Sequence, residues 1–429
     1  MTDTRPLLRA IFDAGVAAAH PDRILAHHLP PPPKGRVIVL ATGKGGAALA
    51  AAAERHYLDT LKLDPSRLTG LATTRHGHAV PTRSIEVVEA GHPVPDEAGL
   101  DAAHRTLKIA RGARGDDLVL VLISGGGSAN WFAPVDGIGF KQKQQMNRTL
   151  LRSGAPIGDI NTVRKHLSRI KGGRLARAAY PARTVTLAIS DVPHDDPAVI
   201  ASGPTVPDPS TLADARAVIA KYKLTPDAEI VAALSDPQNE SCKPGDAELS
   251  AASYAIIARP RDSLDAAVLM AQQAGYETVD LGADLEGEAR DVAADHARLA
   301  LKAKAEGRKL AILSGGELTV TVTGNGRGGP NQEYALALAM HLGGTTGISA
   351  LAADTDGADG GAGSASDPAG AIIDAKTVAA MTAHKLDAAA YLANNDATGF
   401  FETTGDLVHT GPTMTNVNDI RVILVTPSS

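Results

Sequence analysis

The chain has 429 residues, of which 44% are hydrophobic and 21% charged, and this length predicts two domains. The net charge of -6 and an aromatic content of 3% argue against nucleic acid as a partner. A single cysteine, Cys242, excludes an internal disulfide and predicts a reducing compartment.

The N-terminal residues predict a helix rather than an export or membrane segment. Leu8, Ile11, Phe12 and Val16 recur at helical spacing, whereas Asp13 interrupts the hydrophobic run that a signal peptide needs. No apolar run approaches the roughly 20 residues of a membrane span. We therefore expect a cytoplasmic protein that does not bind a membrane.

Several segments share a pattern in which a β-branched or leucine-rich run ends in Gly, Ser or Asp and a helical segment follows. They are residues 36–46, 116–128, 183–196, 309–317 and 347–361. Apolar runs without alternation indicate strands buried on both faces, hence a parallel sheet covered by helices, which binds ligands at the carboxyl ends of its strands. Residues 318–329, "LTVTVTGNGRGG", alternate with period two and predict a strand, a tight turn and a mixed sheet in the second half. Residues 234–250 are polar and could be a linker or a long loop.

The first glycine loop admits two interpretations. Gly43, Gly45 and Ala48 fit the loose dinucleotide pattern G-x-G-x-x-A, but the next strand ends in Thr-Thr-Arg at 73–75, without the acid that would bind a ribose. Lys44 places a cation beside the N–H groups of a helix N-terminus, and a phosphate oxygen would satisfy both. The alternative is a tight turn with a solvated lysine.

A second loop, "ISGGGSAN" at 123–130, leaves backbone N–H groups unobstructed, as in an anion-binding nest. Two such loops after neighbouring parallel strands would form one phosphate-binding rim.

Residues 160–176, "INTVRKHLSRIKGGRLA", predict a strongly basic helix that ends at Gly172–Gly173. Its charges form either a solvated face or a surface for an anionic substrate.

Other polar residues follow predicted strands. Asp191 stands where a catalytic carboxylate would be placed, whereas Asp195 and Asp196 fit turn or helix-cap acids. Arg327 lies among glycines and could reach a bound anion bidentately. Residues 354–359 resemble the start of a calcium loop, but the glutamate of its twelfth position is missing. A magnesium or substrate role and a capped turn stay open there.

Taken together, the motifs resemble the glycerate 2-kinase family, the class II bacterial glycerate kinases, whose C-terminal module is called MOFRL. The resemblance rests on an ordered set of strings that covers nearly the whole chain: "TGKGG", "GHPVPDEAG", "LISGGGSA", "NTVRKHLSRIKGGRLA", "SDVPHDDPAVIASGPTVPD", "SGGELTVTVTGNGRGGPNQE", "AADTDGADG" and "TGPTMTNVNDIRVIL". It implies an α/β fold with two domains, the first Rossmann-like with a mainly parallel sheet and the second with a mixed sheet, and an active site in the cleft between them. We place the domains at residues 1–237 and 238–429, with the MOFRL module at about 307–425.

The resemblance implies ATP-dependent phosphorylation of D-glycerate to 2-phosphoglycerate, with Mg²⁺ as the metal. The matched catalytic candidates are Lys44, Asp191 and Arg327, and the metal candidates are Asp191 and Asp354. Nucleotide-binding residues are predicted in the strand-end loops, namely Gly43, Gly45, Ser124, Gly125, Gly126, Gly127, Ser128, Gly315, Gly316 and Glu317. The alternatives are an NAD(P)H-dependent hydroxypyruvate reductase, a name that many relatives carry, and a noncatalytic metabolite-binding protein. A homodimer stays open.

Overall fold

The computed structural model describes residues 3–361, 364 and 366–427, which form two compact units. Residues 24–257 make the N-terminal unit, and the segments through residue 23 and from residue 258 onward make the C-terminal unit. No helix in the described part of the chain is long and apolar enough to cross a membrane.

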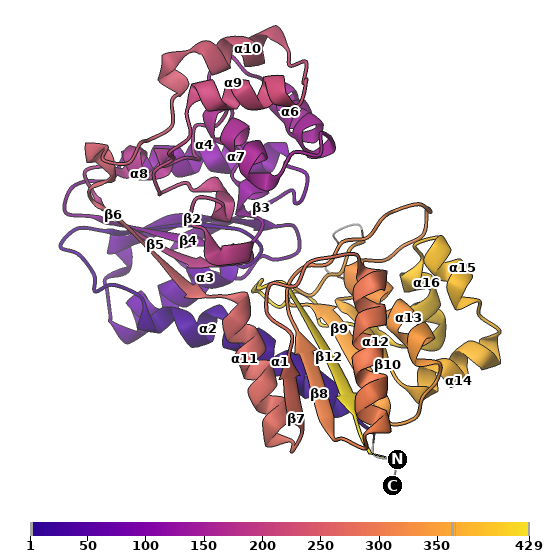
Figure 1. The fold of residues 1–429 in the computed structure, drawn as a ribbon. Coiled ribbons are helices and arrows are strands. Elements are labelled where there is room, and N and C mark those ends of the chain that lie inside the picture. Colours follow the sequence, from indigo (N-terminus) through magenta and orange to yellow (C-terminus); the bar gives the residue numbers. More distant parts are fainter. Residues whose placement is uncertain (1–2, 362–363, 365, 428–429) are drawn as a thin grey trace. The chain divides into compact units, whose positions relative to one another are not determined.

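The N-terminal unit is built on a sheet with strand order β3-β2-β1-β4-β5-β6, in which β1 to β5 run parallel to one another (Figure 1). The strands are β1 (Val37–Thr42), β2 (Leu68–Arg75), β3 (Ile85–Ala90), β4 (Leu118–Ile123), β5 (Arg183–Ile189) and β6 (Ala252–Ala258). Every residue of β1 and β4 is buried, which explains their apolar runs without alternation.

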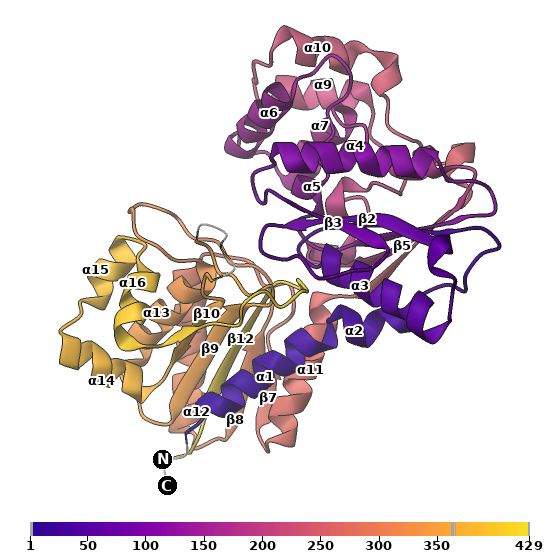
Figure 2. The ribbon, with the colours of Figure 1, turned by 180° about the vertical axis from the view of Figure 1, so that it is seen from behind.

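Helices cover both faces of this sheet, with α3 on one side and α4 and α8 on the other (Figures 1 and 2). The helices of the unit are α3 (Gly46–Arg55), α4 (Glu97–Arg111), α5 (Gly127–Asn130), α6 (Phe140–Arg152), α7 (Ile157–His166), α8 (Arg174–Ala179), α9 (Leu212–Lys221) and α10 (Ala228–Ser235). The short helix α2 (Pro21–Ile24) spans the chain boundary between the two units, which falls after residue 23. A separate apolar cluster joins α6, α7, α9 and α10.

The C-terminal unit has a mixed sheet with strand order β11-β10-β9-β12-β8-β7. The strands are β7 (Glu277–Asp280), β8 (Leu310–Ser314), β9 (Ile348–Asp354), β10 (Gly370–Ile373), β11 (Leu407–Val408) and β12 (Asp419–Val425). Strand β12 is antiparallel to both β8 and β9, whereas β7 and β8 are parallel. The predicted α/β class, with a mainly parallel first sheet and a mixed second sheet, is therefore confirmed.

Alternate residues of β12 explain how this sheet is covered. Ile420, Val422 and Leu424 pack with α1 and α11 on one face, and Ile423 and Val425 pack with α12 and α13 on the other. The helices of the unit are α1 (Arg5–Ala18), α11 (Pro260–Gln273), α12 (Ala289–Ala305), α13 (Pro330–Leu342), α14 (Ala375–His384), α15 (Ala388–Ala393) and α16 (Ala397–Thr404). The amphipathic N-terminal helix predicted from Leu8, Ile11 and Phe12 is confirmed.

The compact units have different bounds from the predicted domains. Helix α1 belongs with the C-terminal unit, because its buried residues complete the core beneath β12. Residues 238–257 belong with the N-terminal unit, because β6 lies beside β5 and the amide of Cys242 donates to the carbonyl of Gly172 (3.0 Å). The polar stretch 234–250 is thus a loop of the N-terminal unit rather than a linker.

One predicted strand is wrong, and one predicted helix is shorter than expected. Residues 318–323 form no strand beyond an isolated bridge at Thr319, because the amides of Thr321 and Thr323 donate to the side chains of Glu288 and Asn395 instead of to a neighbouring strand. The basic helix predicted from residue 160 up to Gly172–Gly173 exists as α7 but ends already at His166. Residues 167–173 then form an irregular segment before α8.

Candidate functional site

Three of the predicted site segments meet at one edge of the N-terminal sheet. Lys44 follows β1, the loop 124–126 follows β4, and Asp191 follows β5. Because β1, β4 and β5 are parallel neighbours, their carboxyl ends lie side by side at that edge. The fold therefore brings together candidates that are up to 147 positions apart in the chain, as the difference between 191 and 44 gives.

The two glycine loops are joined by hydrogen bonds. The amide of Lys44 donates to the carbonyl of Gly125 (2.8 Å), and the amide of Gly45 donates to the hydroxyl of Ser124 (2.8 Å). These first-loop amides are therefore occupied by the protein. Within the described residues, the amides of Gly126, Gly127 and Ser128 donate to no protein group, so the second loop is the part that can receive an anion.

Glycine is required where the loops approach. Gly43 has φ +102°, and a Cβ there would overlap the carbonyl oxygen of Ser124. Gly126 has φ +84°, and a Cβ there would lie 2.8 Å from the ring of His92. Both residues thus combine a left-handed backbone with close neighbours.

We expect Gly43→Ala to destabilise the protein by about 3 kcal/mol, because it adds a steric overlap to the cost of a left-handed alanine. Gly137→Ala is the matched control: Gly137 has φ +81° but nothing lies within 4 Å of its added Cβ, so about 1 kcal/mol is expected. Thermal unfolding of both variants checks this. Equal shifts in Tm would show that the loops do not need the close approach.

A pocket of about 300 Å³ lies beside the second loop. Besides Gly126 and Ser128, its lining includes apolar side chains and four basic side chains: Lys143, Arg148, Arg164 and Lys171. Burial lowers the pKa of Lys143 well below its usual range. A small pocket with several cations and exposed backbone amides is suited to a small anionic ligand.

Lys171 connects this pocket to the loop. Its side chain is buried, and Nζ donates to the carbonyl oxygen of Ser128 (2.9 Å). Burial, followed by the positive charge of Arg164, lowers the pKa of Lys171 to about 7. A small change in its surroundings, such as a bound carboxylate, would therefore return it to the cationic form.

The basic segment is not a solvated face. Lys165 Nζ lies 3.4 Å from Asp208 Oδ1, His166 Nε2 lies 2.8 Å from Glu240 Oε1, and the side chains of Lys165 and His166 are buried. These contacts bind α7 to two loops, one before α9 that holds Asp208 and one after α10 that holds Glu240, while Arg164 and Lys171 line the pocket. The segment thus has a structural half and a half that can contact a ligand.

Asp191 is half-buried just beyond β5. Burial and then the carboxylates of Asp191 and Asp196 raise the pKa of Tyr254. The two carboxylates therefore lie close enough to the Tyr254 hydroxyl to disfavour its ionisation. Asp196 accepts a hydrogen bond from the amide of Ala198 (2.8 Å), as expected of a turn acid. Asp191 stays the candidate for chemistry.

The remaining predicted residues belong to the C-terminal unit. Arg327 is exposed and forms a bidentate ion pair with Glu402 (3.0 and 2.6 Å). The carbonyls of Gly315 and Gly316, after β8, accept from the buried guanidinium of Arg421. Glu317 is exposed beside them.

The acidic loop after β9 is partly explained by its local contacts. Asp354 Oδ1 accepts from the amide of Asp356 (2.9 Å). The buried Asp359 accepts from the amides of Asn331 and Gln332 (3.0 and 2.8 Å) at the start of α13, which makes it a cap of that helix. Burial raises the pKa of Asp359 to about 7. The capped-turn interpretation thus holds for Asp359.

Sequence reasoning missed several pocket residues. His92 belongs to "GHPVPDEAG", a string that carried the resemblance without an assigned role, and Lys143 and Arg148 lie on α6, a helix without any distinctive motif. Only the basic character of 164–171 signalled that cations would gather here. Residues of α6 and of the second loop line the same pocket, and this tertiary arrangement cannot be predicted from a local sequence pattern.

Comparison with known proteins finds relatives that cover nearly the whole chain. Residues 7–235 match the model of a domain of unknown function, DUF4147, and residues 310–419 match the MOFRL family. A protein of Agrobacterium vitis, provisionally named hydroxypyruvate reductase, is 47% identical over 427 residues, which cover 98% of this chain and 94% of that protein.

Two further comparisons concern Thermotoga maritima. A protein named D-glycerate 2-kinase is 39% identical over 361 residues, covering 83% of this chain and 84% of that protein. A crystal structure of glycerate kinase from the same organism matches with a TM-score of 0.85 and 36% identity, covering 98% of this chain and 99% of that one. The chain therefore belongs to the glycerate 2-kinase family, with its DUF4147 region preceding its MOFRL region.

Proposed function

We propose that this protein transfers the γ-phosphoryl group of ATP to the C2 hydroxyl of D-glycerate, which forms 2-phosphoglycerate and ADP. The observation that carries the proposal is the meeting of Lys44, the second glycine loop and Asp191 at adjoining strand ends, beside a pocket with several cations. Relatives that are named glycerate kinases support the choice of substrate.

The groups at this edge have different roles in phosphoryl transfer. The ammonium of Lys44 and the amides of residues 126–128 hold phosphate oxygens, since this reaction needs chiefly positioning and charge stabilisation. Arg164 and Lys171, in the pocket beside the loop, bind the carboxylate of glycerate. A cationic Lys171 is favoured by that carboxylate, although its pKa in the protein is about 7.

Asp191 orients the substrate. The C2 oxygen forms a bond to the γ-phosphorus while the bond from that phosphorus to the bridging oxygen of ADP breaks, and Asp191 accepts the hydroxyl proton. Arg327 can exchange its exposed partner Glu402 for an oxygen of the transferring group or of a carboxylate. Gly43, Gly45 and residues 315–317 contribute to nucleotide binding in this proposal.

The residues present fit a magnesium ion. The described residues hold no group of three or more His, Cys, Asp or Glu side chains that could ligate a metal. Mg²⁺ at nucleotide sites needs only one or two carboxylates together with phosphate oxygens, and Asp191 is the first candidate and Asp354 the second. Bound Mg²⁺ would neutralise phosphate charge.

We also place the protein in the cytoplasm and leave a homodimer open.

The test is ADP release by the purified protein with Mg-ATP, with and without D-glycerate, and identification of the product by ³¹P and ¹H NMR. We expect glycerate-dependent ADP and a phosphate on C2. Oxidation of NADH or NADPH with hydroxypyruvate, in the absence of ADP formation, would instead establish the reductase.

The end of β2 argues against the reductase, because the buried Thr73, Thr74 and Arg75 there offer no acid for a dinucleotide ribose.

A ligand-induced rise in Tm without turnover of either substrate pair would contradict the kinase as well. It would identify a noncatalytic metabolite-binding protein, because a ligand that binds only the folded state stabilises it.

A further inference from the structure

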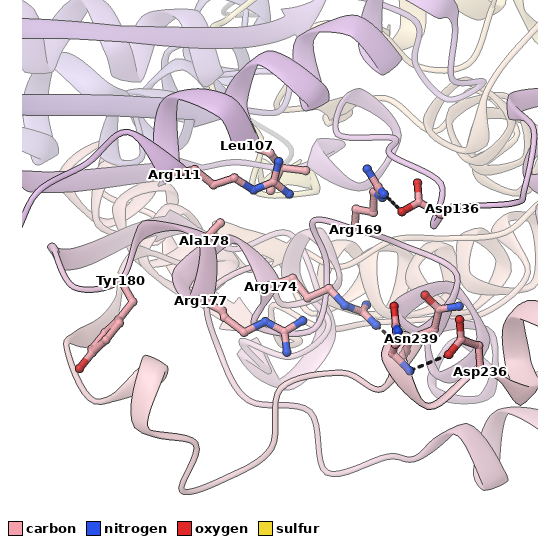
Figure 3. A pocket seen from close by; sticks show the side chains of 11 residues that line it. Leu107, Arg111, Asp136, Arg169, Arg174, Arg177, Ala178, Tyr180, Asp236 and Asn239 are labelled. Atoms are coloured by element: carbon pink, nitrogen blue, oxygen red, sulfur yellow. Dashed lines mark hydrogen bonds and ion pairs between the residues drawn. The ribbon is translucent and has the colours of Figure 1, made fainter.

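A second pocket in the N-terminal unit is rich in arginine. It has a volume of about 560 Å³ and shares no lining residue with the pocket beside the glycine loop. Figure 3 shows Arg111 and Arg169 on one side of it and Arg174 and Arg177 on the other. Arg111 ends α4, and Arg174 and Arg177 lie on α8.

The positive charge of this pocket is only partly balanced. Of its two aspartates, Asp136 forms an ion pair with Arg169, and Asp236 accepts from the amide of Gln238 (2.9 Å). Among the residues that the structure describes, the guanidinium groups of Arg111 and Arg177 donate to no protein group and form no ion pair.

Arg174 adds a buried charge that forms no direct ion pair within the described residues, although the carboxylates of Asp208 and Glu240 raise its pKa from a distance. Its guanidinium donates to the carbonyl oxygens of Lys165 (2.5 Å), Ser168 and Asn239 (2.5 Å). Burial, followed by the charge of Arg177, lowers the pKa of Arg174 to about 10. The backbone carbonyls therefore hold Arg174 in place but leave its charge to act on whatever occupies the pocket.

Catalysis as proposed above does not use these arginines. Arginine presents a planar, permanently charged fork that binds phosphate oxygens bidentately. The volume is that of a pocket for a small metabolite, and half-exposed Arg177 and exposed Arg111 can close on a ligand without leaving other partners. We propose that this pocket, lined by Arg111, Arg169, Arg174 and Arg177, is a second anion site that binds a small molecule carrying phosphate groups.

Inorganic pyrophosphate is a suitable probe, titrated calorimetrically without Mg²⁺ into the full-length protein. We expect Arg111→Ala/Arg177→Ala to weaken one pyrophosphate site at least ~10-fold, since each arginine supplies charged hydrogen bonds to phosphate. The matched control is Lys108→Ala/Arg183→Ala, which removes the same charge from exposed positions outside the pocket. This control should change the affinity less than about 2-fold.

The Lys44→Ala background separates the two sites. Pyrophosphate binding that survives in Lys44→Ala and disappears when both arginines are also replaced belongs to the arginine pocket. If Lys44→Ala leaves all binding unchanged, the assignment of Lys44 fails while the arginine pocket stands. Equal affinities in the arginine and control variants, equal losses in both, or no binding by the wild-type protein would each overturn the second site.

Orthophosphate in the same titration distinguishes the class of ligand. Weaker binding than pyrophosphate is expected, because a single phosphate cannot engage arginines on both sides of the pocket. Orthophosphate binding as tight as that of pyrophosphate would overturn a site for a larger phosphate-bearing molecule.

Discussion

Replacement of Lys44 by alanine is expected to lower kcat/KM for D-glycerate phosphorylation by about 100- to 1000-fold, the scale on which enzymes lose one preorganised charge-stabilising group. The reason is geometric: the Lys44 amide is bound to Gly125 (2.8 Å), so the second loop holds the lysine at the strand end. Coupled measurement of ADP release over a range of substrate concentrations gives the constant.

Two further variants define what Lys44 contributes. Lys44→Met keeps the aliphatic stem without the charge and should lose as much activity as Lys44→Ala. Lys34→Ala, which removes an exposed lysine elsewhere in the same unit, should keep near-normal kcat/KM. A Lys44→Met enzyme with normal turnover would show that packing, not charge, explains the residue.

Asp191→Asn should lower kcat by about 1000-fold while the Kd for ADP stays near that of the wild-type protein. The amide cannot accept the hydroxyl proton, and general acid–base catalysis contributes on this scale. Turnover assays and calorimetric titration of ADP measure the two quantities. Asp196→Asn is the control, because the structure gives Asp196 a turn contact.

The dependence on Mg²⁺ separates the two roles considered for Asp191. If Asp191 holds the metal, a higher Mg²⁺ concentration should restore part of the activity of Asp191→Asn, because metal affinity is what the variant has lost. If Asp191 is the base, Mg²⁺ should restore nothing. An unchanged kcat in Asp191→Asn would contradict both roles.

Strands β1, β4 and β5 of the N-terminal sheet could be predicted because each carries its own signal. β1 and β4 are runs buried on both faces, and such runs need no knowledge of their neighbours to be recognised. The same reliance on local patterns made the prediction for segment 318–323 wrong. Its residues alternate as in a strand, but its amides donate to the side chains of Glu288 and Asn395. A side chain that takes the place of a neighbouring strand cannot be seen in a local pattern.

The basic segment shows a similar limit. Its charges were visible in the sequence, but the partners that decide their roles lie far along the chain. Lys165 pairs with Asp208 and His166 with Glu240, whereas Lys171 contacts the backbone of Ser128. A helix shortened at His166 also directs the residues after it differently from a continuous helix.

The sequence by itself determined the α/β class, the glycine loops, the catalytic candidates Lys44 and Asp191 and the family, because these depend on local patterns and on motif order. Only the tertiary structure decided which loops share an edge, that α1 completes the C-terminal core, and that four arginines surround one pocket. The physical reason is that strand order and side-chain pairing are contacts between distant residues. Their free energies depend on burial and distance in the folded chain, which spacing along the sequence does not contain.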